Sequence, residues 1–209
     1  MQEILQASNV IFKSIIKYPE IRIEKGKFTF LQGPSGCGKS TLLKLFNGTL
    51  SADSGSILYN GQNIEGMNTI LLRQEVLLVG QSVYLFQGTI EDNFKVYYGY
   101  RNLDCPSREE IKGFLSMCCA DFPLDTICDT MSGGERQRVY ISICVSLTPK
   151  VLMLDEPTSA LDETSANNMI GNIKSFCKER NITLLGITHD TKLAEKYADN
   201  IIYFEGRME

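Results

Sequence analysis

The stretch of sequence that decides the fold reads Gly33-Pro34-Ser35-Gly36-Cys37-Gly38-Lys39-Ser40-Thr41, which satisfies the pattern G-x-x-x-x-G-K-S/T. An apolar run precedes it over residues 27–32, and apolar residues at helical spacing follow it over 41–46. A glycine-rich turn between a strand and a helix points its backbone N–H groups, and the positive end of the helix dipole, at phosphate oxygens. Lys39 is expected to reach the β- and γ-phosphates and Ser40 to complete a Mg²⁺ shell. The stretch therefore predicts a nucleoside triphosphate site rather than an ordinary glycine-rich helix cap.

Short apolar runs elsewhere predict strands that are buried on both faces. They occupy residues 151–154, 184–188 and 201–204, and helically spaced apolar residues lie between the first two. Strands that alternate with helices predict an α/β fold with a mainly parallel sheet. Residues from about 91 to 129 lack such runs, so we expect one domain over 1–209, with a core of 1–90 and 130–209 and a helical subdomain between them.

Two acidic residues, Asp155 and Glu156, directly follow the buried strand at 151–154. Ligands of open α/β sheets gather at the carboxyl ends of the strands, so Asp155 is placed to hold Mg²⁺ directly or through water. Side chains alternate along a strand, so Glu156 is expected to point elsewhere and to accept a proton from an attacking water as general base. A plain solvated turn is the alternative, and the phosphate-binding stretch favours the functional interpretation.

A second candidate anion site is Ser132-Gly133-Gly134-Glu135, which opens a predicted helix. Ser132 and Glu135 fit a capping box, which is the structural alternative. The two glycines expose N–H groups at the start of the helix, as an anion site requires. Two phosphate cradles far apart in one chain suggest that two chains share each nucleotide.

Together these motifs resemble the nucleotide-binding subunit of an ABC transporter. The resemblance rests on GPSGCGKST, on the signature SGGE and on VLMLDEP, and three more elements match in order. Gln81 resembles the Q-loop glutamine, Ser159-Ala160-Leu161-Asp162 the D-loop, and His189 the switch histidine. The match covers nearly the whole chain. The segments Arg73-Gln74-Glu75-Val76 and LFQGTIEDNF are similar to those of small stand-alone ATPases of two-component exporters, among them an iron-export type.

The resemblance implies a P-loop NTPase fold of the ABC type, with an antiparallel N-terminal β portion, and an ATP sandwich between two subunits. Lys39 and Ser40 of one subunit would hold ATP with Mg²⁺, while Ser132, Gly133 and Gly134 of the other would close over the γ-phosphate. Glu156 would activate water, and His189 would hold the γ-phosphate and that water. Gln81 would sense Mg²⁺ and the membrane partner, and Asp162 would link the two sites. Phe12, with Tyr18 as its alternative, would stack on the base.

Composition and charge argue against several kinds of partner and site for this chain. Its 209 residues are 43% hydrophobic and carry 21 Lys+Arg against 25 Asp+Glu, a net charge of −4, which argues against a nucleic-acid partner. Residues 1–5 do not look like a secretory leader, and no apolar run approaches the roughly 18 residues of a membrane span. Seven cysteines without CxxC spacing are expected to be reduced thiols, and a metal site at Cys118-Cys119 is disfavoured. We expect no regulatory domain after Glu209.

The resemblance predicts a cytoplasmic ATPase, bound peripherally to the membrane through a separate multi-span permease. Two alternatives remain at this point: an ATPase of a soluble assembly complex, such as iron–sulfur cluster building, and a nucleotide-gated switch that barely hydrolyses ATP. The transported substrate, the direction of transport and the resting oligomeric state are set outside these motifs.

Overall fold

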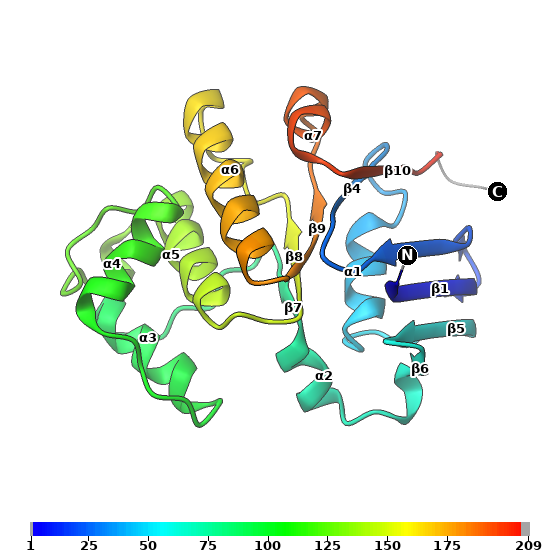
Figure 1. The fold of residues 1–209 in the computed structure, drawn as a ribbon, viewed down its shortest axis with the longest axis horizontal. Coiled ribbons are helices and arrows are strands. Elements are labelled where there is room, and N and C mark those ends of the chain that lie inside the picture. The colour runs from blue at the N-terminus through cyan, green and yellow to red at the C-terminus, as the bar shows by residue number, and fades with distance from the viewer. Residues whose placement is uncertain (1, 206–209) are drawn as a thin grey trace.

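A parallel sheet forms the centre of the computed structural model, which describes residues 2–205 (Figure 1). Its strand order is β10-β4-β9-β8-β7, and each neighbouring pair is parallel. All residues of β4, β8 and β9 are buried, and most of them are apolar; the buried polar exceptions are Thr29, Gln32, Asp155 and Thr183. The strands are β4 (Phe28–Gln32), β7 (Val76–Val79), β8 (Val151–Asp155), β9 (Thr183–Ile187) and β10 (Asn200–Tyr203). The expected α/β fold with a parallel core sheet is confirmed.

A second sheet is antiparallel and is formed by the N-terminal part of the chain. Its order is β2-β1-β5-β6, with β3 also paired to β1, and Leu5 of β1 lies opposite Ile23 on one side and Tyr59 on the other. The strands are β1 (Glu3–Phe12), β2 (Ile16–Lys17), β3 (Ile21–Glu24), β5 (Ser54–Tyr59) and β6 (Gln62–Asn63). The antiparallel β portion implied by the resemblance is therefore present.

Helix α1 (Lys39–Phe46) lies between the two sheets (Figure 1). Its residues Leu42, Leu43, Leu45 and Phe46 belong to one apolar cluster with residues of both sheets. The loop that precedes α1 is thereby fixed at the carboxyl end of β4. Helix α2 (Thr69–Glu75) follows the short 3₁₀ turn η1 (Ile64–Gly66) and leads into β7.

The opposite face of the parallel sheet is covered by α5 (Gly133–Ser146), α6 (Glu163–Glu179) and α7 (Thr191–Tyr197). Leu152 and Leu154 of β8 point to this face, whereas Val151 and Met153 point toward α1. Because side chains alternate along β8, α1 packs on one face of the sheet and α5 packs on the other.

A third apolar cluster holds together the helical part of the chain. It joins α3 (Ile90–Gly99) and α4 (Arg108–Met117) to α5, and the 3₁₀ turn η2 (Cys128–Thr130) precedes α5. The helical subdomain that the sequence predicts over about 91–129 therefore shares its core with a helix that begins at Gly133.

Within residues 2–205, no helix combines the length and the apolar character that crossing a membrane requires. Met1 and Glu209, which bear on the expectations about a leader and a C-terminal domain, lie outside the described residues.

Candidate functional site

The phosphate-binding loop, residues 33–41, connects β4 to α1 with three glycines at positive φ: 148° at Gly33, 79° at Gly36 and 99° at Gly38. A Cβ on Gly33 would lie 2.5 Å from the carbonyl oxygen of Phe204. A Cβ on Gly38 would lie 2.9 Å from the hydroxyl of Tyr18, which itself donates to the carbonyl of Gly38 at 3.0 Å. The loop is therefore supported from beneath by Tyr18 and Phe204, which directly follow β2 and β10, and its curled backbone favours glycine at these positions.

The Lys39 side chain is buried in this loop and is only 5% exposed. Its Nζ donates to the carbonyls of Gly33 and Pro34, both at 2.8 Å, and lies 3.6 Å from Cys37 Sγ. Pro34 and its neighbours Ser35 and Gly36 are exposed, and Thr41 is half-buried. An ammonium group held at the centre of an exposed glycine-rich loop can neutralise the charge of a polyphosphate.

Asp155, at the carboxyl end of β8, meets the phosphate-binding loop through Ser40. The Ser40 hydroxyl donates to Asp155 Oδ1 at 3.0 Å. The Asp155 side chain is only 4% exposed, and burial raises the pKa of its carboxyl above the usual range, although the hydrogen bond from Ser40 acts in the opposite direction. A buried carboxylate beside a hydroxyl is a hard-oxygen pair that a divalent cation would neutralise, so these two residues fit Mg²⁺.

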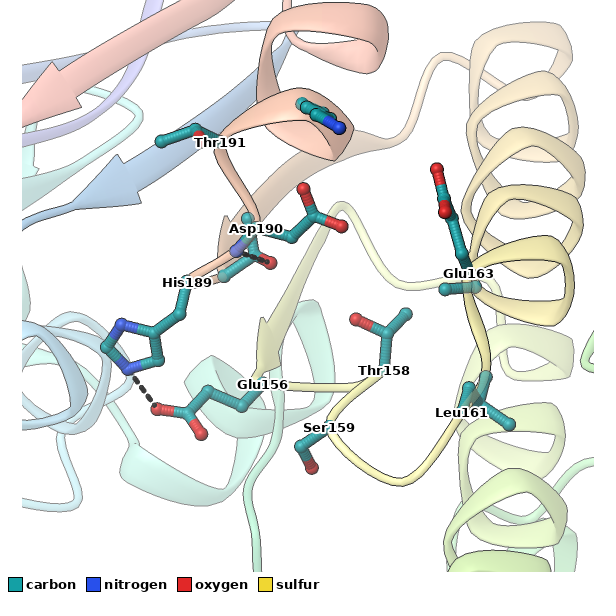
Figure 2. Close-up of a pocket in the computed structure, with 11 residues that line it drawn as sticks. Glu156, Thr158, Ser159, Leu161, Glu163, His189, Asp190 and Thr191 are labelled. Atoms are coloured by element: carbon teal, nitrogen blue, oxygen red, sulfur yellow. Dashed lines mark hydrogen bonds and ion pairs between the residues drawn. The ribbon is translucent and has the colours of Figure 1, made fainter.

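Glu156, the next residue, points toward His189 (Figure 2). Glu156 Oε1 and His189 Nε2 lie 3.0 Å apart, within hydrogen-bond distance. The Glu156 backbone adopts a left-handed φ of 53°, and its N–H donates to the carbonyl of Ile187 at 3.1 Å. This conformation, unusual for a glutamate, turns the carboxylate toward the end of β9, where His189 is located.

A cavity of about 490 Å³ opens beside this pair and is lined by residues that follow β8 and β9, among them Ser159, Leu161 and Asp190 (Figure 2). Asp162, at the end of the D-loop segment, caps α6: its Oδ1 accepts from the backbone of Ser165 at 3.0 Å and its Oδ2 from the Ser165 hydroxyl at 2.7 Å. These hydrogen bonds lower the pKa of the Asp162 carboxyl.

The signature Ser132-Gly133-Gly134 lies at the start of α5, on the other face of the sheet from α1. Ser132 forms a full capping box, because its N–H donates to Glu135 Oε2 at 2.8 Å and its hydroxyl accepts from the backbone of Glu135 at 3.4 Å. A Cβ on Gly134 would lie 3.2 Å from Cβ of Ala160. The structure thus places the signature against the D-loop of its own chain and separates it from its own phosphate-binding loop by the sheet.

The remaining predicted residues lie around this centre. Gln81 is exposed and follows β7 by two residues. Phe12 is half-buried at the end of β1, with the Lys13 ammonium 5.6 Å from its ring centroid. Tyr18 is only 5% exposed and packs edge-on against Phe204, so little of its ring is available to a base. This burial favours Phe12 over Tyr18 for stacking on the base, and the assignment stays a prediction.

The support that Tyr18 gives beneath Gly38 is a contact across 20 positions, which nothing in the local sequence predicts. Asn93 was not predicted either, and it is fully buried in α3 among the backbone groups of residues 86–89. A polar residue in the otherwise apolar stripe of this helix was the available signal.

Comparison with known proteins identifies similar chains over nearly the whole length. Residues 16–159 match the family described as ABC transporter. The chain is 36% identical over 210 residues to the probable iron export ATP-binding protein FetA of Escherichia coli, with 97% of this chain and 92% of that protein covered. It is 34% identical over 193 residues to the Fe(3+) ions import ATP-binding protein FbpC of Photobacterium profundum, with 90% and 54% covered.

Among solved structures, cbiO1 of Clostridium perfringens, described as part of the ABC transporter complex cbiONQ, superposes with a TM-score of 0.81. The two sequences are 28% identical, and the alignment covers 97% of this chain and 85% of that one. Some relatives are much longer, since the chain spans 31% and 35% of two proteins from Methanosarcina species.

Proposed function

Because the chain belongs to the ABC transporter ATP-binding family, whose members hydrolyse ATP to power transport, we propose that two copies close around shared ATP and drive a separate permease. The observation that carries this proposal is the convergence of Lys39, Ser40 and Asp155 at the carboxyl ends of β4 and β8, with Glu156 and His189 paired at the neighbouring strand ends. The resemblance seen in the sequence motifs is confirmed at the level of the family.

The phosphate chain of ATP would bind along the exposed backbone of residues 33–41. Lys39 would exchange its two loop carbonyls for phosphate oxygens, which are stronger partners because they are charged. Bound Mg²⁺ would supply charge neutralisation at the β- and γ-phosphates, and Ser40 and Asp155 would hold it. Phe12 would stack on the base at the edge of the antiparallel sheet.

Glu156 would accept the proton of the attacking water. Its carboxylate is 27% exposed, so water reaches it, and His189 lies at 3.0 Å to orient it and to meet the γ-phosphate. A switch that barely hydrolyses ATP has no need for a glutamate held in a left-handed backbone conformation opposite a histidine. We therefore favour turnover over the switch.

A dimer is needed because one chain keeps its two phosphate cradles apart. Ser132, Gly133 and Gly134 begin α5, on the face of the sheet opposite α1, and Ser132 is exposed. In a head-to-tail pair, these residues of one copy can reach the nucleotide on the phosphate-binding loop of the other. Asp162, close to the signature through the Ala160 contact, lies where the two sites would communicate.

Exposed aromatic residues beside Gln81 support docking to a permease. Tyr84 is 68% exposed and Phe86 41% exposed, and the Phe86 ring packs against Tyr97 and the 69% exposed Tyr100 at centroid distances of 5.7 and 6.0 Å. Such an apolar patch next to Gln81 fits a docking surface for a protein partner, and because the chain belongs to a transporter family we favour a permease at the cytoplasmic face as that partner. For the cargo, we favour iron export, because the FetA relative aligns over 92% of its own length.

Phosphate release by the purified chain with Mg²⁺ and ATP tests the hydrolytic part of this function. The wild type is expected to turn over, and Glu156→Gln to lose about 10²- to 10⁴-fold in kcat while it still binds ATP. Full turnover by Glu156→Gln would mean that another group activates the water. For docking, Tyr84→Ser with Phe86→Ser should abolish co-purification with a co-expressed multi-span membrane protein while it leaves ATP binding intact.

A further inference from the structure

The segment that follows Gln81 is joined to the segment that leads into the signature. Cys128 N–H donates to the carbonyl of Gly88 at 2.9 Å, and Ile90 N–H donates to the carbonyl of Thr126 at 3.0 Å. An isolated antiparallel bridge lies between these two hydrogen bonds. Residues 88–90, which follow the exposed aromatic residues, and residues 126–128, which precede the signature, therefore lie side by side, although about 40 positions separate them along the chain.

Asn93 of α3 lies at the centre of this junction and is completely buried. Its Oδ1 accepts from the N–H of Phe86 at 2.7 Å, and its Nδ2 donates to the carbonyls of Phe86 and Thr89, both at 3.0 Å. The same Nδ2 lies 3.4 Å from Cys128 Sγ. The Asn93 amide thus bonds both backbone groups of Phe86 and also contacts Cys128, which begins the 3₁₀ turn before the signature.

Cys128 is in turn fastened to the first turns of α5. The Arg136 guanidinium donates to the carbonyl of Cys128 at 2.7 Å and to Asp129 Oδ1 at 3.2 Å, and Met131 N–H donates to the same carbonyl of Cys128 at 3.2 Å. Ser132 follows directly. These contacts connect Phe86 through Asn93 and Cys128 to Met131 and Arg136, which adjoin the serine of the signature.

We propose that Asn93 is a positioning residue that holds the signature in register with the docking segment, so that movement imposed at Phe86 moves Ser132. This proposal rests on the function proposed above, in which Phe86 meets a permease and Ser132 meets ATP. Asn93 touches neither nucleotide nor permease and acts through the backbone of its neighbours. The competing interpretation is that Asn93 only stabilises the helical part of the chain.

A matched control separates these two interpretations. Tyr98 lies on the same helix, is 8% exposed and donates from its hydroxyl to the carbonyl of Ser146 at 2.8 Å, at the far end of α5 from the signature. Tyr98→Phe therefore removes a buried hydrogen bond from the same core without touching the junction. Asn93→Ser is the matching change, since a serine can still bond the carbonyl four residues earlier, Thr89, but cannot reach Phe86.

Hydrogen–deuterium exchange on the full chain is the first measurement. In Asn93→Ser, the amides of residues 84–89 and of 126–132 should both exchange at least about tenfold faster than in wild type, because both segments lose their common fastening. Tyr98→Phe should leave both segments at the wild-type rate, even where its melting temperature falls as far. Wild-type exchange over 126–132 in a folded Asn93→Ser would overturn the proposal.

Kinetics supply the second measurement. Asn93→Ser should lower kcat at saturating ATP by about tenfold, since misplacing a group by about 1 Å can cost as much as 10²-fold, while the dissociation constant for ATP stays within about twofold. An equal kcat in Asn93→Ser and Tyr98→Phe would overturn the proposal. If Asn93→Ser folds poorly, Cys128→Ala takes its place, and unchanged exchange over residues 84–89 in that variant would overturn it too. If the wild type itself has no ATPase activity, the proposed function fails, while the exchange experiment still decides the role of Asn93.

Discussion

Asp155→Asn should make the ligand-free protein more stable and at the same time less able to bind Mg·ATP. The Asp155 carboxyl is 4% exposed, and burial raises its pKa, so the folded state disfavours the charged form. The amide of asparagine removes this buried charge, keeps nearly the same shape and still accepts the hydrogen bond from Ser40. The cost is a weaker attraction to Lys39 and Lys44, which act on the same carboxyl.

The expected magnitude is a gain of about 1 kcal/mol, which lies within the range of single stabilising substitutions. For a chain of this size that corresponds to a rise in melting temperature of about 2–4 °C. Because the pKa of Asp155 is raised in the folded state, the native protein loses stability as the pH rises through that pKa. The gap between variant and wild type should therefore be present at neutral pH and should close at acidic pH, where the carboxyl is protonated.

Thermal unfolding with and without Mg·ATP is the assay. A ligand at 100 times its dissociation constant stabilises by about 2.7 kcal/mol, so the wild type should gain about 5–11 °C and overtake Asp155→Asn, which should gain little. Ser40→Ala is the control, since it removes the donor that favours the charged carboxylate and should lower stability while it also weakens Mg²⁺ binding. A ligand-free Asp155→Asn that melts several degrees lower, or that gains as much from Mg·ATP as wild type, would refute the reasoning.

Three further predictions follow from the same geometry. Lys39→Ala should lose ATP binding measured by fluorescence titration, because the charge held by the carbonyls of Gly33 and Pro34 disappears; an unchanged affinity would contradict the phosphate-binding loop. Gly33→Ala should lower the free energy of unfolding, measured in urea, by more than about 2 kcal/mol, since its Cβ would meet the carbonyl of Phe204 at 2.5 Å. The Cβ of Gly36→Ala meets nothing within 4 Å, so this control should lose only about 1 kcal/mol through backbone strain. His189→Ala should lower kcat with little change in the dissociation constant for ATP, and a loss confined to ATP affinity would argue against its role in orienting Glu156 for hydrolysis.

Much of the fold could be predicted because the buried strands can be recognised from their local sequence. β4, β8 and β9 are buried on both faces, so their sequences are mostly apolar. The glycines of the phosphate-binding loop adopt positive φ angles that other residues rarely adopt. Asp155 and Glu156 were predictable for the same reason, since the strand that carries them ends where ligands gather in such sheets.

Other features depend on contacts across the fold and leave no local trace. Tyr18 reads as an aromatic free to stack on a base, yet packing against Phe204 and the hydrogen bond to Gly38 bury it. Asn93 reads as one polar residue in a helix, and only the fold shows that it satisfies the backbone of Phe86. The core that α5 shares with α3 and α4 likewise depends on packing across the fold. A boundary placed at residue 129 from composition alone leaves α5 outside the helical subdomain.

Light scattering on Glu156→Gln, with and without ATP, tests most directly the central claim that two copies share each nucleotide. The variant should keep the phosphate-binding loop, Ser40 and Asp155 intact and lose only the group that accepts the proton, so bound ATP should persist. We predict a mass near 23.4 kDa without ATP and about twice that value with ATP. A mass that stays at one chain while ATP is demonstrably bound would contradict the shared site.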